Sequence, residues 1–325
     1  MIAKAITGES LALAALVMFS ISTVLTKVAS GRLNLNAGFL ISISVNVAFA
    51  TLAFCAQLAL RQEALRWNAF GFFLFLVSGA FTTYLGRWFF FESIARLGPA
   101  KASTFQVSSP LFTVAIAWLF LGERLSTAAI GAMALTLFGL FVVSVNPSAL
   151  VRSGPDARAA VRTSASGVAV PTRATTPFGA LLRSGLVLGV GSSAAYAVGN
   201  VLRGAAIRHW NEAILGALLG ALAGITLHLL FGTGTAKVLR DLRASDRTAL
   251  LAYSAGGILT ISAQMCVIAS MAYIPIAVAT LITLCTPVLV FPMSYFFLKN
   301  EEGIGPRTVF GGALTVAGIA MVILL

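Results

Sequence analysis

Charged residues are scarce in this sequence, and their scarcity excludes a water-soluble protein. Only 10% of the 325 residues are charged, whereas a soluble globular protein carries about a quarter. In contrast, 58% of the residues are apolar and the mean hydropathy is +0.95. Such a chain can cover its surface with apolar atoms only if lipid is its solvent. The composition therefore predicts an integral membrane protein.

The residues that build cofactor and catalytic sites are also few. The three cysteines, Cys55, Cys266 and Cys285, sit in apolar runs without paired spacing, which favours small buried hydrophobes over disulfides or metal ligands. Of the two histidines, His209 lies in a loop and His228 stands alone, so neither a metal site nor a Ser/His constellation can be assembled. A GxxxxGK[ST] motif is absent. We therefore expect no cofactor, no metal and no enzyme activity.

Positive charge exceeds negative charge, with 22 Lys and Arg against 10 Asp and Glu. The cations are spread over short interhelical loops instead of forming a basic stripe, so no nucleic-acid partner is expected. Their role is to set the topology in the bilayer.

Ten apolar runs are each long enough to cross a hydrocarbon core of about 30 Å as a helix. They lie near 9–29, 37–59, 69–95, 101–121, 127–145, 180–206, 212–231, 248–272, 276–298 and 306–325. The first run lacks a clear cleavage site and is interpreted as an uncleaved span. The segment 147–177 is rich in Ala, Arg, Ser, Thr and Pro, which predicts a flexible linker between 1–146 and 178–325.

The two halves repeat each other at an offset of 177 residues. The matched pairs are Gly8 and Gly185, Asn34 and Asn211, Gly79 and Gly256, Ser93 and Ser270, and Pro110 and Pro287. Matched Pro, Asn and Gly are harder to attribute to chance than matched Leu or Ala. Because each half has an odd number of spans, the second enters the membrane from the opposite side. The sequence thus predicts an all-α integral membrane fold of ten transmembrane helices as two inverted five-helix repeats, as in many secondary transporters.

Several motifs carry a family resemblance. They are GPAKAS at 98–103, SSPLF at 108–112, WLFLGERL at 118–125 and Gly131, with weaker second copies at 277–279, TPVL at 286–289, FFL at 296–298 and Glu301. These runs resemble the EamA domain of the drug/metabolite transporter superfamily. The resemblance implies a ten-helix carrier that exports or exchanges small metabolites.

Arg87 is the outstanding polar residue within a predicted span. Its repeat mate is Gln264, and both are expected to face a central polar cavity, since a polar group in lipid is costly. An alternative is that Arg87 pairs with Glu92 or a backbone carbonyl and only holds helices together. Lys27 and Arg203 stand near helix ends and are interpreted as snorkelling side chains.

The fourth and ninth spans share a pattern of two polar groups, three residues apart, just before a proline. The residues are Gln106, Ser109 and Pro110 in one span, and Thr283, Thr286 and Pro287 in the other. A proline within a membrane helix frees a carbonyl that needs a partner or a wet cavity. We interpret the four polar residues as substrate contacts and the two prolines as hinges, with ordinary kinking and Ser/Thr back-bonding as the alternative.

Further substrate-contact candidates lie on the first, third and sixth spans. Thr23 and Asn200 are repeat mates, Tyr196 shares the face of Asn200, and Tyr84 and Trp88 lie near Arg87. Simple packing is the alternative for these aromatic residues. The buried cation favours a carboxylate-bearing substrate, for which amino acids and related metabolites fit best. Glu92, the one carboxylate deep in a span, is the candidate for coupling to protons.

The expected partners are a small solute and the lipid bilayer, and the expected state is a monomer or homodimer in the cell (inner) membrane. Predicted loops on one side hold 15 of the 22 cations, which places both termini outside the cytoplasm, whereas the resemblance implies the opposite orientation. Gly216, Gly220 and Gly224 are spaced for close helix packing within the chain. An intramembrane lipid-modifying enzyme and a non-transporting scaffold are the alternative functions.

Overall fold

The structure is a computed structural model of the whole chain. It describes residues 2–30, 32–33, 35–90, 108–122, 126–144, 185–231, 246–286, 288–290, 293 and 306–324. The predicted linker 147–177 lies outside these described residues.

The described residues form ten helices and no strand, when the π-helix η1 is counted with the helix α3 that it continues. In chain order they are α1 (Ile2–Ser30), α2 (Leu35–Leu60), α3 (Ala69–Gly79) with η1 (Ala80–Gly86), α6 (Ser109–Leu121), α7 (Thr127–Ser144), α11 (Gly185–His209), α12 (Ala213–Phe231), α14 (Arg247–Ser270), α15 (Ile276–Leu284) and α17 (Pro306–Leu324). One helix overlaps each predicted span. The prediction of an all-α, ten-helix fold is confirmed.

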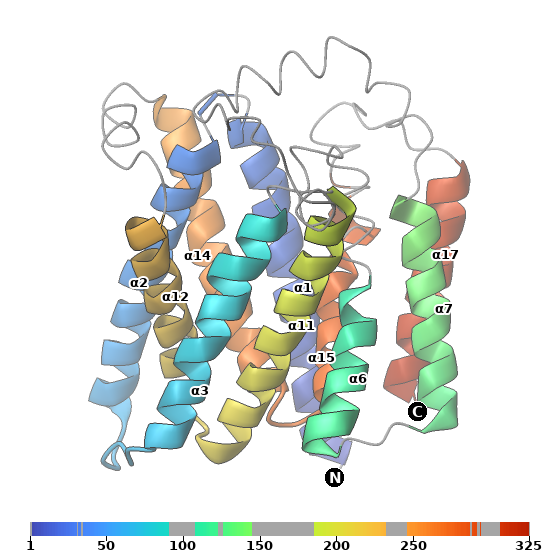
Figure 1. Cartoon of the computed structure of the whole chain (residues 1–325), viewed down its shortest axis with the longest axis horizontal. Coiled ribbons are helices and arrows are strands. Elements are labelled where there is room, and N and C mark those ends of the chain that lie inside the picture. The colour runs from blue at the N-terminus through green and yellow to red at the C-terminus, as the bar shows by residue number, and fades with distance from the viewer. Residues whose placement is uncertain are drawn as a thin grey trace, which may run out of the picture.

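The two halves run through the bundle in opposite senses. Figure 1 shows α1, α3 and α7 rising and α2 and α6 descending, while α11, α14 and α17 descend and α12 and α15 rise. Both chain ends lie at the lower end of the bundle in this view, which we call the terminal face. The other end is called the opposite face.

The packing of the helices is preserved when the two halves are exchanged. Helix α1 packs on α14, and its counterpart α11 packs on α3. Likewise, α2 packs on α14 and α12 on α3, while α15 packs on α1 and α6 on α11. The pairs α2–α12, α6–α15 and α7–α17 join equivalent helices. Each half therefore buries its first and third helices against the other half.

Glycines let α12 and α3 approach closely, as the spacing of Gly216, Gly220 and Gly224 predicts. Gly220 lies against the backbone of Gly79, and a Cβ on Gly216 would meet the ring of Phe75. These contacts are within the chain, so this glycine stripe is used for helix packing between the halves.

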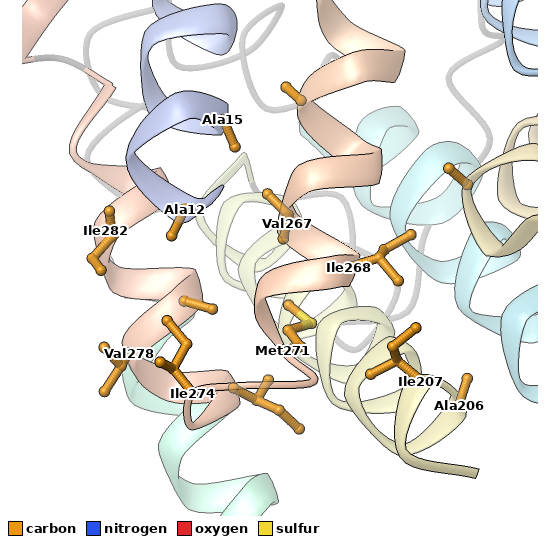
Figure 2. Close-up of a cluster of buried hydrophobic side chains, with 14 of the residues drawn as sticks. Ala12, Ala15, Ala206, Ile207, Val267, Ile268, Met271, Ile274, Val278 and Ile282 are labelled. Carbon is orange, nitrogen blue, oxygen red and sulfur yellow. The ribbon is translucent and has the colours of Figure 1, made fainter. Parts of the chain in front are cut away.

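The main apolar core lies toward the terminal face. Figure 2 shows part of it, built from the start of α1, the ends of α11 and α14, and α15. We call this set the terminal core; the side chains labelled there are Ala12, Ala15, Ala206, Ile207, Val267, Ile268, Met271, Ile274, Val278 and Ile282. The second cluster, near the opposite face, joins only α1, α2 and α14, through Ala29, Leu33, Ala37, Ala249 and Tyr253. The two halves thus meet in a continuous apolar core at one end.

The outer surface is suited to lipid. Five described helices are individually long and apolar enough to cross a membrane: Ala5–Thr26, Ala37–Leu60, Ala69–Phe90, Ala213–Phe231 and Arg247–Ser270. Large apolar side chains point outward, such as Trp118, Leu119 and Phe120, which are 64%, 68% and 74% exposed. Such exposure is stable only in an apolar solvent. The chain is a multi-pass membrane protein.

At each end of the bundle, a polar contact between a helix-capping residue and the other half, here called a polar clasp, joins the two halves. At the opposite face, Asp246 caps α14 by accepting from Thr248 N–H, and Arg32 Nη1 donates to Asp246 Oδ2 at 2.9 Å. At the terminal face, Asn68 caps α3, and its Nδ2 donates to the backbone oxygen of His209 at 3.2 Å. In both places the residue that caps the third helix of one half contacts the chain at the end of the first helix of the other half.

We expect Asp246→Ala to lower the melting temperature of the purified protein at neutral pH, with the loss fading in acid. The backbone N–H of Thr248 and then the Arg32 guanidinium hold the pKa of Asp246 below its ordinary value of 3.8. A carboxyl with a lowered folded pKa stabilises the fold above its unfolded pKa of about 4, and this stability is lost as pH falls through the folded pKa. Melting curves of both proteins at pH 7 and near pH 3 measure the effect. A difference in melting temperature between the two proteins that stays the same from pH 7 to pH 3 would contradict this prediction.

Candidate functional site

A π-helical turn interrupts the third helix in the upper part of the bundle. Residues Ala80–Gly86 form η1. At its end, the backbone oxygen of Gly86 accepts a hydrogen bond of 2.8 Å from Ser192 Oγ on α11. Single π-helical turns are frequently found at functional sites. The junction of η1 and α11 is therefore the natural place to look for a site.

Helix α11 presents one polar face to η1. Ser192, Tyr196, Gly199 and Arg203 are spaced four, three and four residues apart, so they share a face. A Cβ on Gly199 would collide with the methyl group of Thr82, which shows how closely the two helices approach. The face therefore places a phenol and a guanidinium directly against the π-helical turn.

Arg203 is a buried cation on this face. Its side chain is only 6% exposed, and its Nη2 donates to Thr82 Oγ1 at 2.6 Å. The Thr82 hydroxyl in turn donates to the backbone oxygen of Ser78 at 2.8 Å. The interpretation of Arg203 as a snorkelling side chain at a helix end is wrong, because the guanidinium bonds inward to η1.

Arg87 follows η1 and is surrounded by helices from both halves. Its Cζ lies 3.8 Å from the centroid of the Phe39 ring on α2, a cation–π contact. Tyr196 of α11, His228 of α12 and Tyr253 of α14 are close enough to interact with its charge. Arg87 is only partly buried. The described neighbours of Arg87 thus include one aromatic ring in contact and three titratable side chains within electrostatic reach.

Tyr196 connects the two cations. Its hydroxyl group is within electrostatic reach of both Arg87 and Arg203. Its ring packs against Gly86, where a Cβ would come within 3.1 Å of the ring. The two guanidiniums and the phenol therefore belong to one polar cluster, which we call the α11–η1 site and define as Thr82, Arg87, Tyr196 and Arg203.

The structure does not bring the predicted pair Arg87 and Gln264 together. Arg87 lies toward the opposite face, whereas Gln264 lies in the part of α14 that approaches the terminal face. The reason is the inversion of the halves, because it carries a position near one face to a position near the other. The Oε1 of Gln264 is buried and has no hydrogen-bond partner among the described residues.

Helices α6 and α15, which carry or adjoin the described residues of this pattern, pack against each other. Ser109 is fully buried, with no partner for its Oγ among the described residues. Thr283 and Thr286 donate to carbonyls of their own helix, as back-bonding predicts. Pro110 occupies the first turn of α6, where a missing N–H costs nothing. Gln106, Pro287 and Glu92 lie outside the described residues.

The remaining candidates lie outside the α11–η1 site as defined. Thr23 is exposed, and Asn200 is partly buried. The ring of Tyr84 packs toward Phe231, with centroids 6.1 Å apart. Trp88 is 51% exposed on the outer surface, although it adjoins Arg87 in sequence. Their substrate roles stay predictions.

A second polar cluster was missed by the sequence reasoning because it forms around a loop. Glu212, between α11 and α12, has a side chain only 4% exposed and lies 2.6 Å from Arg61 Nη1. Gln57 Nε2 donates to its other oxygen at 3.3 Å, and nearby Trp210 Nε1 donates to the backbone oxygen of Arg66 at 2.9 Å. This cluster reinforces the terminal face, where α2 meets the second half.

The sequence matches one protein-family model, and the structure is similar in fold to a solved structure. The model described as "EamA-like transporter family" matches residues 6–145 and, a second time, 183–324. A solved structure described only as "Crystal structure of protein" superposes with a TM-score of 0.68 and 17% sequence identity, over 98% of this chain and 97% of that chain. At such low identity the likeness concerns the fold alone. No curated protein matches the chain.

Proposed function

The chain belongs to the EamA-like transporter family, and from this premise we propose that it is a secondary carrier of small carboxylate-bearing solutes. Amino acids and related metabolites are the substrates that we propose, moved by export or exchange. Membrane transport is the general activity of the family, while the substrate class and the mechanism are our proposals.

Alternating access is supported by the exchangeable packing of the two halves. Each half contributes its first and third helices to the contact with the other half, in the same pairing from both sides. In inverted-repeat carriers, exchanging the conformations of the halves converts an opening on one side into an opening on the other. The terminal core supports a conformation closed at the terminal face, since it joins α1, α11, α14 and α15 there.

Arg87 is the observation that carries the substrate class. Its guanidinium contacts Phe39 of α2 in the first half and is within electrostatic reach of Tyr196, His228 and Tyr253 in the second half. A guanidinium presents a planar fork of donors that matches a carboxylate. A charged side chain in the low dielectric of a membrane interior costs free energy, so its presence there usually indicates a functional role. A carboxylate held there would be bound by both halves.

We expect Arg87→Met to reduce transport of carboxylate-bearing solutes by about 100-fold, because truncating a charge-assisted contact typically costs a few kcal/mol. Arg87→Lys should retain part of the activity, since it keeps the charge but loses the fork. The measurement is uptake of labelled amino acids and small organic acids by proteoliposomes that contain the purified protein.

The matched control is Arg307→Gln, which removes an exposed cation at the start of α17. It should transport like the unmodified protein. Melting temperatures of all variants separate loss of transport from loss of fold. Undiminished uptake by a folded Arg87→Met variant would remove Arg87 from the site.

A further inference from the structure

An ion pair at the terminal face joins the end of α2, in the first half, to the start of α12, in the second half. Arg61 Nη1 lies 2.6 Å from Glu212 Oε1, and Gln57 Nε2 donates to Glu212 Oε2 at 3.3 Å. The backbone oxygen of Glu212 accepts the hydrogen bond of Gly216 N–H in the first turn of α12. The Glu212 carboxylate is therefore held by the end of α2, while its backbone belongs to α12.

One stripe of α2 faces α12 and leads inward from this ion pair. Four residues spaced seven, seven and four positions apart share this face of the helix: Ile43, Ala50, Gln57 and Arg61. A Cβ on Gly224 of α12 would lie 3.2 Å from Ile43 Cδ1, and both Ile43 and Ala50 are fully buried. Ala50 therefore lies behind the ion pair, between α2 and α12.

Helices α1 and α14 are in contact from one face of the bundle to the other. Gly8, near the start of α1, packs on Ile274, just past the end of α14. In the middle, Ser22 Oγ donates to the backbone oxygen of Gly256 at 3.0 Å, and the clasp of Arg32 with α14 closes the contact at the opposite face. Such a pair moves as one body, since packed elements shift between discrete arrangements and do not deform continuously. Helix α2 joins this pair, because Gly38 lies against the ring of Tyr253.

Helices α3 and α11 are in contact along their length in the same way. At the terminal face Asn68 Nδ2 donates to the backbone oxygen of His209, and toward the opposite face Ser192 Oγ donates to the oxygen of Gly86. Helix α12 joins this pair through its glycine stripe against α3. Arg61 is thus carried by the α1–α14 pair and Glu212 by the α3–α11 pair. A relative movement of the two pairs that opens the terminal face separates the two charges.

The repeat gives this ion pair no equivalent at the other end of the bundle. Under the offset of 177 residues, Glu212, Gln57 and Arg61 correspond to Leu35, Gly234 and Val238. These residues carry neither charge nor a side-chain amide. The interaction of Arg61 with Glu212 can therefore hold only the terminal face.

We propose that the ion pair of Arg61 and Glu212 is a latch that keeps the terminal face closed and separates each time this face opens. The inference rests on the proposed function, because a carrier is what requires this face to open. The Glu212 side chain is 4% exposed, so pulling Arg61 away strands a buried carboxylate until water enters. The latch therefore lowers the population of the conformation that is open at the terminal face.

The first test asks whether water reaches the space behind the latch. In a chain whose three native cysteines are replaced by alanine, Ala50→Cys supplies a single thiol, and its reaction with a water-soluble maleimide is followed in detergent. Combining Arg61→Gln with Glu212→Gln removes both charges, so that neither is left buried alone. We expect this pair of changes to speed the reaction at least about 10-fold, because the closed conformation loses its latch.

The matched control neutralises the ion pair at the opposite face. Arg32→Gln with Asp246→Asn acts within the α1–α14 pair, and the asparagine can still cap α14. It should change the reaction rate of Ala50→Cys by less than about two-fold. An equal acceleration in the control would show general loosening of the bundle and would overturn the latch, as would an unchanged rate in the latch variant.

The second test fixes the latch covalently and measures transport in proteoliposomes. In the same cysteine-free chain, Arg61→Cys and Glu212→Cys are joined by a bifunctional methanethiosulfonate reagent. Cross-linking should reduce solute uptake at least about 10-fold, and reduction of the disulfides should restore it. The control joins Phe70→Cys to His209→Cys at the same face, where the native rings lie 5.2 Å apart between α3 and α11. Its cross-link should leave uptake within about two-fold, because α3 and α11 move together.

The outcomes separate the latch from the function on which it rests. If the unmodified protein moves no solute, the proposed function fails, and the latch loses its role with it. If the cross-linked Arg61→Cys and Glu212→Cys protein transports at full rate, the latch is overturned while the proposed function stands. If the neutralised variant does not fold, the cross-linking comparison decides alone.

Discussion

Gly79→Ala is expected to destabilise the protein by about 2 to 4 kcal/mol, although alanine is the better helix former. A Cβ at Gly79 would lie 2.5 Å from the Cα and 2.6 Å from the oxygen of Gly220. Both atoms are backbone, so the clash can be relieved only by moving α12 away from α3. That movement would also loosen the neighbouring contact of Phe75 with Gly216. Thermal unfolding in detergent, followed by tryptophan fluorescence, measures the loss.

The same helix contact offers a matched control. A Cβ at Gly220 would lie 3.7 Å from the Cα of Gly79, which is ordinary van der Waals contact. Gly220→Ala adds the same methyl group to the same interface and should leave the melting temperature unchanged or raise it slightly. Equal melting temperatures for the two variants would show that the close approach of α3 and α12 is not as the structure has it.

Arg61→Ala is expected to cost about 2 to 3 kcal/mol, because it leaves the buried Glu212 carboxylate without its cation. This cost is below the roughly 3 to 5 kcal/mol typical of breaking a fully buried ion pair, since the Arg61 side chain is 29% exposed. Adding Glu212→Gln should recover at least half of the loss, because an amide in that position needs no counter-charge. Chemical unfolding of the two single variants and the double variant gives the coupling.

Arg32→Ala at the opposite face is the comparison for that ion pair. The side chains of Arg32 and Asp246 are 52% and 40% exposed, so water screens their attraction. The change should therefore be much smaller than for Arg61→Ala. A larger loss from Arg32→Ala would mean that the opposite face, and not the terminal face, holds the halves together.

The positions of the helices and the inverted orientation of the two halves could be predicted, because both follow from local features of the sequence. Apolar runs separated by breakers such as Asn211 and Pro306 locate the spans, and an odd number of spans per half fixes the inversion. The matched glycines differ in what the structure asks of them: Gly79 lies against the backbone of Gly220, whereas a Cβ at Gly256 would be in ordinary contact with Ser22. These constraints act within a helix or between neighbouring helices, so they remain visible in the sequence.

The site was predicted only in part, because it depends on contacts between distant residues. Arg87 stood out, since a cation deep in an apolar run is unusual without any knowledge of its neighbours. Arg203 did not, because a side chain near a helix end can snorkel or bond inward, and only its contact with Thr82 decides between these. The π-helical turn of η1 leaves no distinctive residue pattern. The face formed by Ser192, Tyr196 and Arg203 was the available signal.

The lopsided placement of the terminal core has an energetic consequence for a carrier that exchanges the conformations of its halves. Under the offset of 177 residues, seven of the ten residues of that core correspond to Gly or apolar residues, whereas Ala15, Ile207 and Val278 correspond to Ser192, Ser30 and Lys101. The mirror-image seal at the other end would therefore have to enclose hydroxyl groups and an ammonium group, which is unfavourable. The two end states are thus unequal in free energy. In the proposed alternating-access cycle, the protein without solute would therefore favour the conformation closed at the side of its chain ends, and solute binding would supply part of the free energy for opening it.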